Sequence, residues 1–258
     1  MISESEAGVV LIDKPVGKTS FAIVRAVRRI FSIKKVGHAG TLDPFATGLL
    51  VVCIGRPATR LISSLMDGEK EYLATVHLGI ESTTLDPEGV LSPGKSPEGI
   101  DAGAVDEALA GFRGTIMQTP PSYSALKYKG KPLYHYARKG IAVEKKPRQV
   151  RIHQLRWCDR RAVLSGAEPT LELLVQCGKG TYIRALAADI GRALGCGAYL
   201  SALRRTRSGF FRVEDSFPGT LLFDERRAAE LHERKMSLED VRKLLQSSTE
   251  VDNMPCSN

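Results

Sequence analysis

Apolar and polar residues follow one another along the chain in patterns that predict both strands and helices. Continuous apolar runs at residues 8–12 and 49–54 are typical of buried strands, and residues 72–78 alternate as a strand does. Thr19 or Ser20 caps a helix that runs to Phe31, since four apolar residues recur there at helical spacing: Ile23, Val24, Val27 and Ile30.

The rest of the chain continues this mixture. Helices are expected at residues 58–65, 104–112 and 182–194, and a strand at residues 171–177. Ser237 to Asp240 resembles a capping box that starts a last helix through Leu245, and we expect disorder after about Ser248. The elements lack the regular alternation of doubly wound proteins, so the predicted fold class is α+β.

The net charge of +8 is concentrated in one stretch of the 258 residues. Residues 119–151 hold nine Lys or Arg against one acidic residue, whereas the remaining chain has 28 basic and 28 acidic residues. The same stretch holds four of the seven tyrosines. Clustered cations neutralise phosphates and tyrosines stack on bases, so this stretch suggests RNA binding; a solvated basic loop is the alternative.

Several classes of protein are disfavoured by composition. No apolar run approaches the roughly 18 residues of a membrane span, and the first residues lack the basic segment of a secretory signal. The five cysteines are odd in number, with no CxxC pair, which disfavours a disulfide framework or a zinc site. We therefore expect a cytoplasmic protein that binds no metal.

Gly17-Lys18-Thr19 lies between a predicted strand and a helix, as a phosphate-binding P-loop does. A P-loop also needs a glycine five residues before Gly17, and Ile12 occupies that position. A nucleotide-binding function is thus the weaker hypothesis, and no nucleotide cofactor is expected.

Residues 37–48, GHAGTLDPFATG, form the segment richest in reactive and turn-forming residues. Loops held by rigid elements are common places for catalytic groups, and Pro44 favours an extended backbone at Asp43. Asp43 is therefore a candidate catalytic carboxylate. The plainer interpretation of Asp43 is a residue of an Asp-Pro turn.

The string GHAGTLDPFATGLL resembles the catalytic motif of the TruB family of tRNA pseudouridine synthases. Further resemblances run in order to about residue 215: VLIDKPVGKTS from Val10, KEY from Lys70, PPSYSALK from Pro120, GKGTYIR from Gly178 and LRRT from Leu203. The resemblance implies a largely antiparallel mixed sheet flanked by helices, with a thumb loop at about 119–151. It also implies isomerisation of the T-loop uridine at position 55 of tRNA.

In this family the aspartate is the essential carboxylate, a role that carries over to Asp43. Asp43 acts either as a nucleophile or as a base during cleavage of the N1–C1′ bond, and no cofactor is required. Arg184 is by resemblance the cation beside it, and Tyr72 is the residue that stacks on the base and removes the C5 proton. Without the resemblance, the plainer interpretation of Arg184 is a surface arginine, and that of Tyr72 is a core residue.

The resemblance also implies residues that bind the substrate. Tyr182 and Leu203 match positions that line the pocket, although Leu203 equally suits an ordinary core. His38 matches a histidine that supports the splayed-out loop bases. The alternative is a histidine whose ring only forms hydrogen bonds with the backbone of the glycine-rich loop. Lys14 matches a residue that props the catalytic loop, and Lys127 ends the thumb signature. The uridine is buried in the folded T loop and has to be flipped out.

The predicted organisation is a catalytic domain at residues 1–215 and a short helical extension at 216–258. Many relatives end in a PUA domain, but 43 residues are too few for that barrel. The expected partner is the T arm of tRNA, without a membrane, and the protein is expected to be a monomer. The competing hypothesis is an RNA-binding protein without catalysis, such as an RNA chaperone or a guide-dependent subunit.

Overall fold

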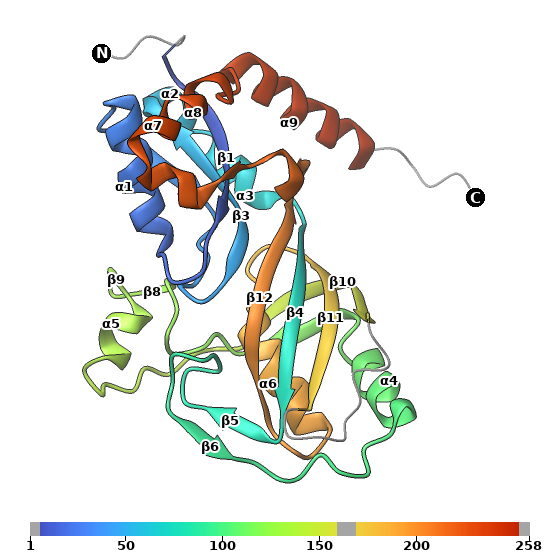
Figure 1. Cartoon of the computed structure of the whole chain (residues 1–258). Helices are drawn as coiled ribbons and strands as arrows, with labels where there is room; N and C mark the ends of the chain where they lie inside the picture. Colours follow the sequence, from blue (N-terminus) through green and yellow to red (C-terminus); the bar gives the residue numbers. More distant parts are fainter. Residues whose placement is uncertain (1–5, 159–168, 253–258) are drawn as a thin grey trace. The chain divides into compact units, whose positions relative to one another are not determined.

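The computed structural model describes residues 6–158 and 169–252 (Figure 1). The chain forms two compact units, one of residues 1–69 and 205–258 and the other of residues 70–204. We call them the terminal unit and the middle unit. Strand β12 (Ala198–Ser208) gives its first residues to the middle unit and its last residues to the terminal unit.

The terminal unit combines a small sheet with helices. Its strands are β1 (Gly8–Lys14), β2 (Val36–Ala39), β3 (Thr47–Ile54), β13 (Phe211–Arg212) and β14 (Phe217–Pro218). Its α-helices are α1 (Ser20–Phe31), α2 (Gly55–Thr59), α3 (Ile62–Asp67), α7 (Glu225–Ala228), α8 (Glu230–Glu233) and α9 (Leu238–Asp252), with 3-10 turns η1 (Val213–Asp215) and η2 (Gly219–Phe223). Strand β1 pairs antiparallel with β3 and parallel with β14, so the sheet is mixed.

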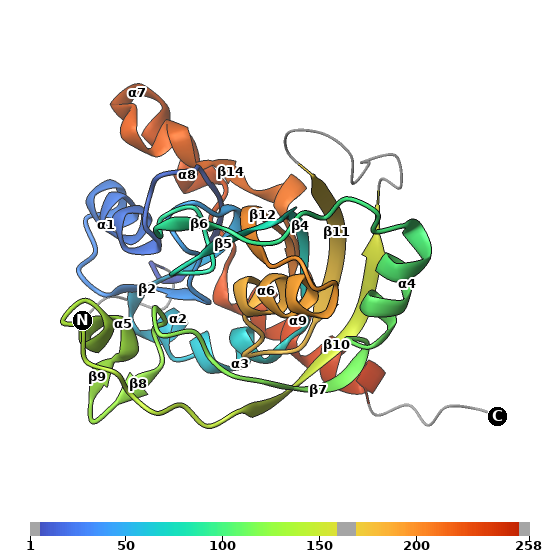
Figure 2. The ribbon, with the colours of Figure 1, turned by 90° about the horizontal axis from the view of Figure 1, so that it is seen from below.

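The middle unit is mainly a sheet in which β7, β10, β11, β4 and β12 are neighbours in that order (Figure 2). Besides β12, the strands of the middle unit are β4 (Lys70–Leu78), β5 (Ile80–Ser82), β6 (Leu91–Pro93), β7 (Gly114–Gln118), β8 (Lys127–Tyr128), β9 (Lys131–Pro132), β10 (Arg148–Trp157) and β11 (Thr170–Cys177). Its helices are α4 (Ala102–Ala110), α5 (Leu133–Ala137) and α6 (Ile183–Ala193). Helix α6 packs on β4, and α4 packs on β10 and α6.

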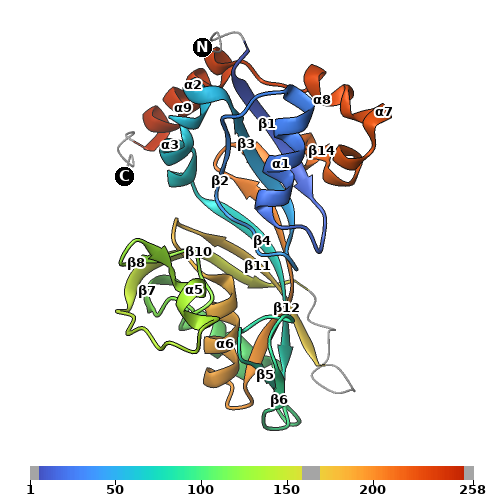
Figure 3. The same cartoon turned by 90° about the vertical axis from the view of Figure 1, so that its left-hand side faces the viewer.

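The alternating direction of side chains along β1 and β3 explains why helices cover both faces of the sheet in the terminal unit (Figure 3). Successive residues of a strand point to opposite faces, and every second residue of β1 and β3 joins the same core. Val9 and Val51 pack with α2, α3 and α9, whereas Val10 and Val52 pack with α1, η2 and α8. Strands that are apolar throughout are therefore buried on both sides, as the apolar runs predict.

Helix ends follow the polar residues that cap them. The Thr19 side chain accepts a hydrogen bond from Ala22 N at 3.0 Å at the start of α1, and Asp101 accepts one from Ala104 N at 2.8 Å at the start of α4. Ser237 Oγ accepts one from Asp240 N at 3.1 Å, as the predicted capping box requires. Each such cap stabilises its helix by about 1 kcal/mol.

The α+β prediction is confirmed, although several element boundaries differ, as in α4, which is predicted at 104–112 and observed at Ala102–Ala110. The helix expected at 58–65 consists of two short helices, α2 and α3, separated by Arg60 and Leu61. Helix α9 packs Leu244 and Leu245 against the core and continues to Asp252, beyond the predicted end at Leu245. The expected disorder after Ser248 is wrong as far as Asp252, and residues 253–258 lie outside the described residues.

Candidate active site

Asp43 lies half-buried on the loop that joins the antiparallel strands β2 and β3. Gly40 and Gly48 flank the loop with φ of +94° and +98°, which L side chains rarely adopt. A Cβ on Gly48 would lie 2.3 Å from the backbone oxygen of Arg205. The glycines of the motif are thus required for the path of the loop and for its close approach to β12.

The residue before Asp43 is held by one buried hydroxyl. Ser20 Oγ accepts a hydrogen bond from Leu42 N and donates one to Leu42 O, both at 2.9 Å. Ser20 is only 3% exposed, and the Leu42 side chain is buried beside it. The first residue of α1 therefore fixes the backbone that leads into Asp43.

The residue after Asp43 is held by a buried ammonium group. Lys14 is fully buried, and its Nζ donates hydrogen bonds to the carbonyls of Pro44 at 3.2 Å, Lys18 at 2.6 Å and Pro15 at 3.0 Å. Gly17 N donates a further bond to Pro44 O at 2.9 Å. This geometry favours the propping role expected of Lys14 over direct contact with a substrate.

Arg205 is a third anchor of the loop, and it was not among the predicted site residues. It is 2% exposed; its Nε donates to Leu49 O at 2.7 Å and its Nη2 to Gly40 O at 3.1 Å. Burial and the positive charge of Arg205 lower the pKa of His38, and the backbone of Gly40 offsets part of this shift. This lowering of the pKa favours the neutral form of the His38 imidazole.

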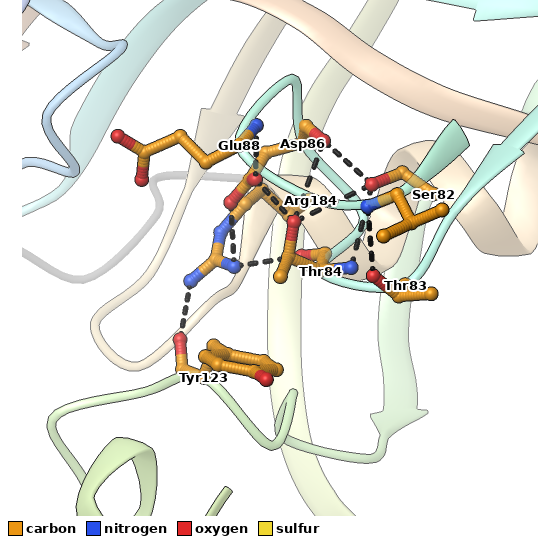
Figure 4. A network of polar contacts seen from close by, with 8 residues as sticks. Ser82, Thr83, Thr84, Asp86, Glu88, Tyr123 and Arg184 are labelled. Carbon is orange, nitrogen blue, oxygen red and sulfur yellow. Dashed lines mark hydrogen bonds and ion pairs between the residues drawn. The ribbon is translucent and has the colours of Figure 1, made fainter. Parts of the chain in front are cut away.

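In the middle unit, Arg184 lies in the first turn of α6 within a buried polar network (Figure 4). Its Nη1 donates to Asp86 Oδ2 at 2.9 Å and to Thr84 O at 2.8 Å, and its Nη2 donates to Tyr123 O at 2.7 Å. The side chains of Arg184 and Asp86 are 5% and 4% exposed. The guanidinium group is thus fixed in position by acceptors from two loops.

Asp86 is also bound from its own loop, between β5 and β6. Its Oδ1 accepts from the Thr84 hydroxyl and from Glu88 N, and its backbone oxygen accepts from Ser82 Oγ. Asp86 was not among the predicted site residues. The available signal was a second Asp-Pro pair, Asp86-Pro87, which repeats the arrangement of Asp43-Pro44.

Tyr182 is the N-cap residue of α6, and Gln118 holds its backbone. The Gln118 side chain accepts from Tyr182 N at 2.7 Å and donates to Tyr182 O at 3.0 Å, although only 1% of Gln118 is exposed. Together, Gln118 and Asp86 determine where the first turn of α6 begins and where Arg184 points.

Tyr72 and Leu203 are buried residues of β4 and β12, 9% and 8% exposed. Lys127 is exposed at the start of a small hairpin, β8–β9, whose turn is Lys129-Gly130 with both φ angles positive. Such a turn suits a two-residue hairpin loop. The hairpin presents its lysines to solvent inside the predicted thumb.

The structure describes the predicted site residues in two groups. Lys14, His38 and Asp43 belong to the terminal unit; the middle unit holds Tyr72, Lys127, Tyr182, Arg184 and Leu203. The roles assigned to these residues, including an Asp43–Arg184 pair, remain predictions. Among the described residues no group of three or more His, Cys, Asp or Glu could hold a metal, and no described helix is long and apolar enough to cross a membrane.

Comparison with solved structures defines the class of protein first. A chain of an H/ACA RNP bound to a substrate RNA containing 2′-deoxyuridine superposes with a TM-score of 0.64 at 25% identity, over 93% of this chain and 62% of that one. A chain of a Cbf5-Nop10-Gar1 complex gives 0.62 at 29% identity, over 86% and 59%. This chain thus spans about three fifths of the length of those solved chains, and its fold is that of pseudouridine synthases.

Family models and curated relatives identify the family. The model for the N-terminal domain of TruB family pseudouridylate synthase matches residues 28–183, and that for the tRNA pseudouridylate synthase B C-terminal domain matches residues 184–250. tRNA pseudouridine synthase B of Desulfotalea psychrophila is 56% identical over 93% of this chain and 97% of that protein; the enzyme of Chlamydia trachomatis serovar L2 is 45% identical over 86% and 89%. The chain belongs to the TruB family of pseudouridylate synthases.

Proposed function

We propose that this protein isomerises the T-loop uridine at position 55 of tRNA to pseudouridine, with Asp43 as the catalytic carboxylate. The names of the curated relatives support tRNA as the substrate. The observation that carries the role of Asp43 is the construction of its loop. Leu42 and Pro44, on either side of Asp43, are bound by two buried side chains, Ser20 and Lys14. Such preorganisation is what a catalytic group needs.

The reaction requires few protein groups. The N1–C1′ bond breaks, the base turns, and C5 is joined to C1′, so that a proton leaves C5 and a proton returns to N1. Asp43 acts as nucleophile or as base in the first step. Tyr72 stacks on the base and accepts the C5 proton, and Arg184 supplies the positive charge that keeps the carboxylate ionised. Neither redox chemistry nor hydrolysis occurs, so no cofactor is assigned.

RNA recognition is assigned to the basic stretch at 119–151, as a thumb that closes on the T arm. Tyr128 and Tyr136 pack edge to face at 5.6 Å within it, and Lys129 Nζ lies 5.5 Å from the Tyr128 ring. Lys127, Lys129 and Lys131 are exposed. His38, Tyr182 and Leu203 are assigned to the flipped-out nucleotide and its neighbours. We further propose that the protein is a cytoplasmic monomer.

Asp43→Asn tests the proposal, because it keeps the size of the side chain and removes its charge. Turnover should fall by several orders of magnitude, since a covalent or charge-stabilising catalyst is lost. Affinity for tRNA should change little. The measurement pairs single-turnover pseudouridine formation with tRNA binding on one preparation of folded variant, without guide RNA or other proteins. Activity within about tenfold of wild type would refute the role of Asp43.

A further inference from the structure

Basic residues are concentrated in a second part of the chain, around α1. From Lys14 to Leu42 the sequence has seven Lys or Arg and no acidic residue. Lys14 is buried under the Asp43 loop, but Lys18, Arg25 and Arg29 are exposed. The zero net charge of the chain outside residues 119–151 therefore conceals a local positive surface in the terminal unit.

These cations and an exposed aromatic ring form a strip along α1. Phe21, Arg25 and Arg29 follow at spacings of four residues, which places them on one side of α1, and Lys18 lies just before the N-cap residue Thr19. Phe21 is 56% exposed, and the Arg25 guanidinium lies 5.5 Å from its ring. Over the described residues, Arg25 and Arg29 form no ion pair.

The polar face of an amphipathic helix accounts for only part of this strip. Arg29 lies in the last turn of α1, where a cation is stabilised by the helix dipole. That effect gives no reason for an exposed phenylalanine in the first turn. Phe223 of η2 is also 44% exposed, with Lys18 Nζ 4.9 Å from its ring. Exposed rings with cations beside them are typical of surfaces that bind nucleic acids.

The strip is continuous with the loop that carries Asp43. The exposed turn at residues 16–19 is attached to this loop, because Gly17 N and Lys14 Nζ both donate to Pro44 O. Ser20, which follows the turn, binds Leu42. An RNA strand that brings a nucleotide to Asp43 therefore has the start of the strip beside it.

We propose that Lys18, Phe21, Arg25 and Arg29, which belong to the terminal unit, form a second RNA-binding surface in addition to the thumb residues of the middle unit. The three cations bind phosphates of the strand next to the target nucleotide, and Phe21 stacks on a base or ribose. Phe21 and Arg29 are eight residues apart, about 12 Å along the helix, enough to follow a short stretch of backbone. The proposal rests on the proposed function, which makes RNA the partner rather than an acidic protein.

The test uses two matched pairs of arginines. Arg25→Gln/Arg29→Gln removes two exposed charges four residues apart on α1. Arg56→Gln/Arg60→Gln does the same at α2, which packs on the other face of the same sheet. Dissociation constants for an unmodified tRNA transcript are measured over a range of salt concentrations, together with single-turnover rates at saturating tRNA.

We expect the α1 pair to weaken binding by about tenfold and to reduce the slope of log affinity against log salt by up to about 2. The α2 pair should leave both unchanged, and both variants should keep the saturated rate within about twofold. Phe21→Leu should weaken binding by at least about fivefold without changing the slope, because stacking carries no charge.

An unchanged slope for the α1 pair would overturn the proposal and leave the strip to another partner, such as an acidic protein. Equal effects of the two pairs would also overturn it, because they would indicate general charge attraction. Failure of the proposed function is a different result: wild-type protein would then bind tRNA without forming pseudouridine.

Discussion

The buried pair of Arg184 and Asp86 gives the sharpest prediction about the middle unit. In Asp86→Asn the side chain keeps its shape, but its charge is lost and an NH2 group replaces one carboxylate oxygen. Both side chains are at most 5% exposed, so solvent screens the pair weakly. Removing one partner of such a pair destabilises a protein by about 3–5 kcal/mol. We expect a loss of this size in the free energy of unfolding, measured by urea denaturation at pH 7.

The double variant Asp86→Asn/Arg184→Met separates stability from catalysis. It also removes the buried cation that loses its Asp86 carboxylate in Asp86→Asn, so part of the lost stability should return. Pseudouridine formation should not return, because Arg184 is assigned to the reaction. Glu230→Gln is the control, since it breaks an exposed ion pair with Arg227 and should have little effect on unfolding.

Two results would contradict this reasoning. A loss below about 1 kcal/mol in Asp86→Asn would show that the pair does not hold Arg184 in place. Recovery of turnover in the double variant, measured as tritium release from C5 of labelled uridine in tRNA, would show that the Arg184 charge is not needed for the reaction.

Four further predictions concern other parts of the protein. Tyr72→Phe should bind tRNA but stall after cleavage of the N1–C1′ bond, and a wild-type rate would reduce Tyr72 to a stacking residue. Changing Lys127, Lys129 and Lys131 together to Gln should reduce the salt slope of tRNA affinity by up to about 3, and an unchanged slope would place the phosphate contacts elsewhere. Lys14→Met removes the Nζ donor from the carbonyls of Pro15 and Lys18, whereas Pro44 O keeps its bond from Gly17 N. Urea denaturation should show a loss of about 1–3 kcal/mol per unsatisfied group and turnover should fall; unchanged values would contradict the propping role. Activity on a prefolded T-arm hairpin should survive EDTA, whereas activity that needs added Mg²⁺ would contradict a metal-free mechanism.

Local pattern in the sequence was sufficient for much of the fold and for the family. The apolar runs of β1 and β3 and the helical spacing in α1 depend on neighbouring residues, so they can be read directly from the chain. The same is true of the glycines around Asp43, because a positive φ is a property of one residue. The motif strings predicted a TruB-type pseudouridine synthase, and the family comparison confirmed it.

The partners of the site residues were decided only by the tertiary structure. Asp86 is 98 residues from Arg184, and Gln118 is 64 residues from Tyr182. Arg205 looks in the sequence like one of several arginines of β12, yet it is buried and binds the carbonyls of Gly40 and Leu49. A charged residue gives no local sign that it will be buried, because its burial depends on acceptors from distant segments that meet only when the chain folds.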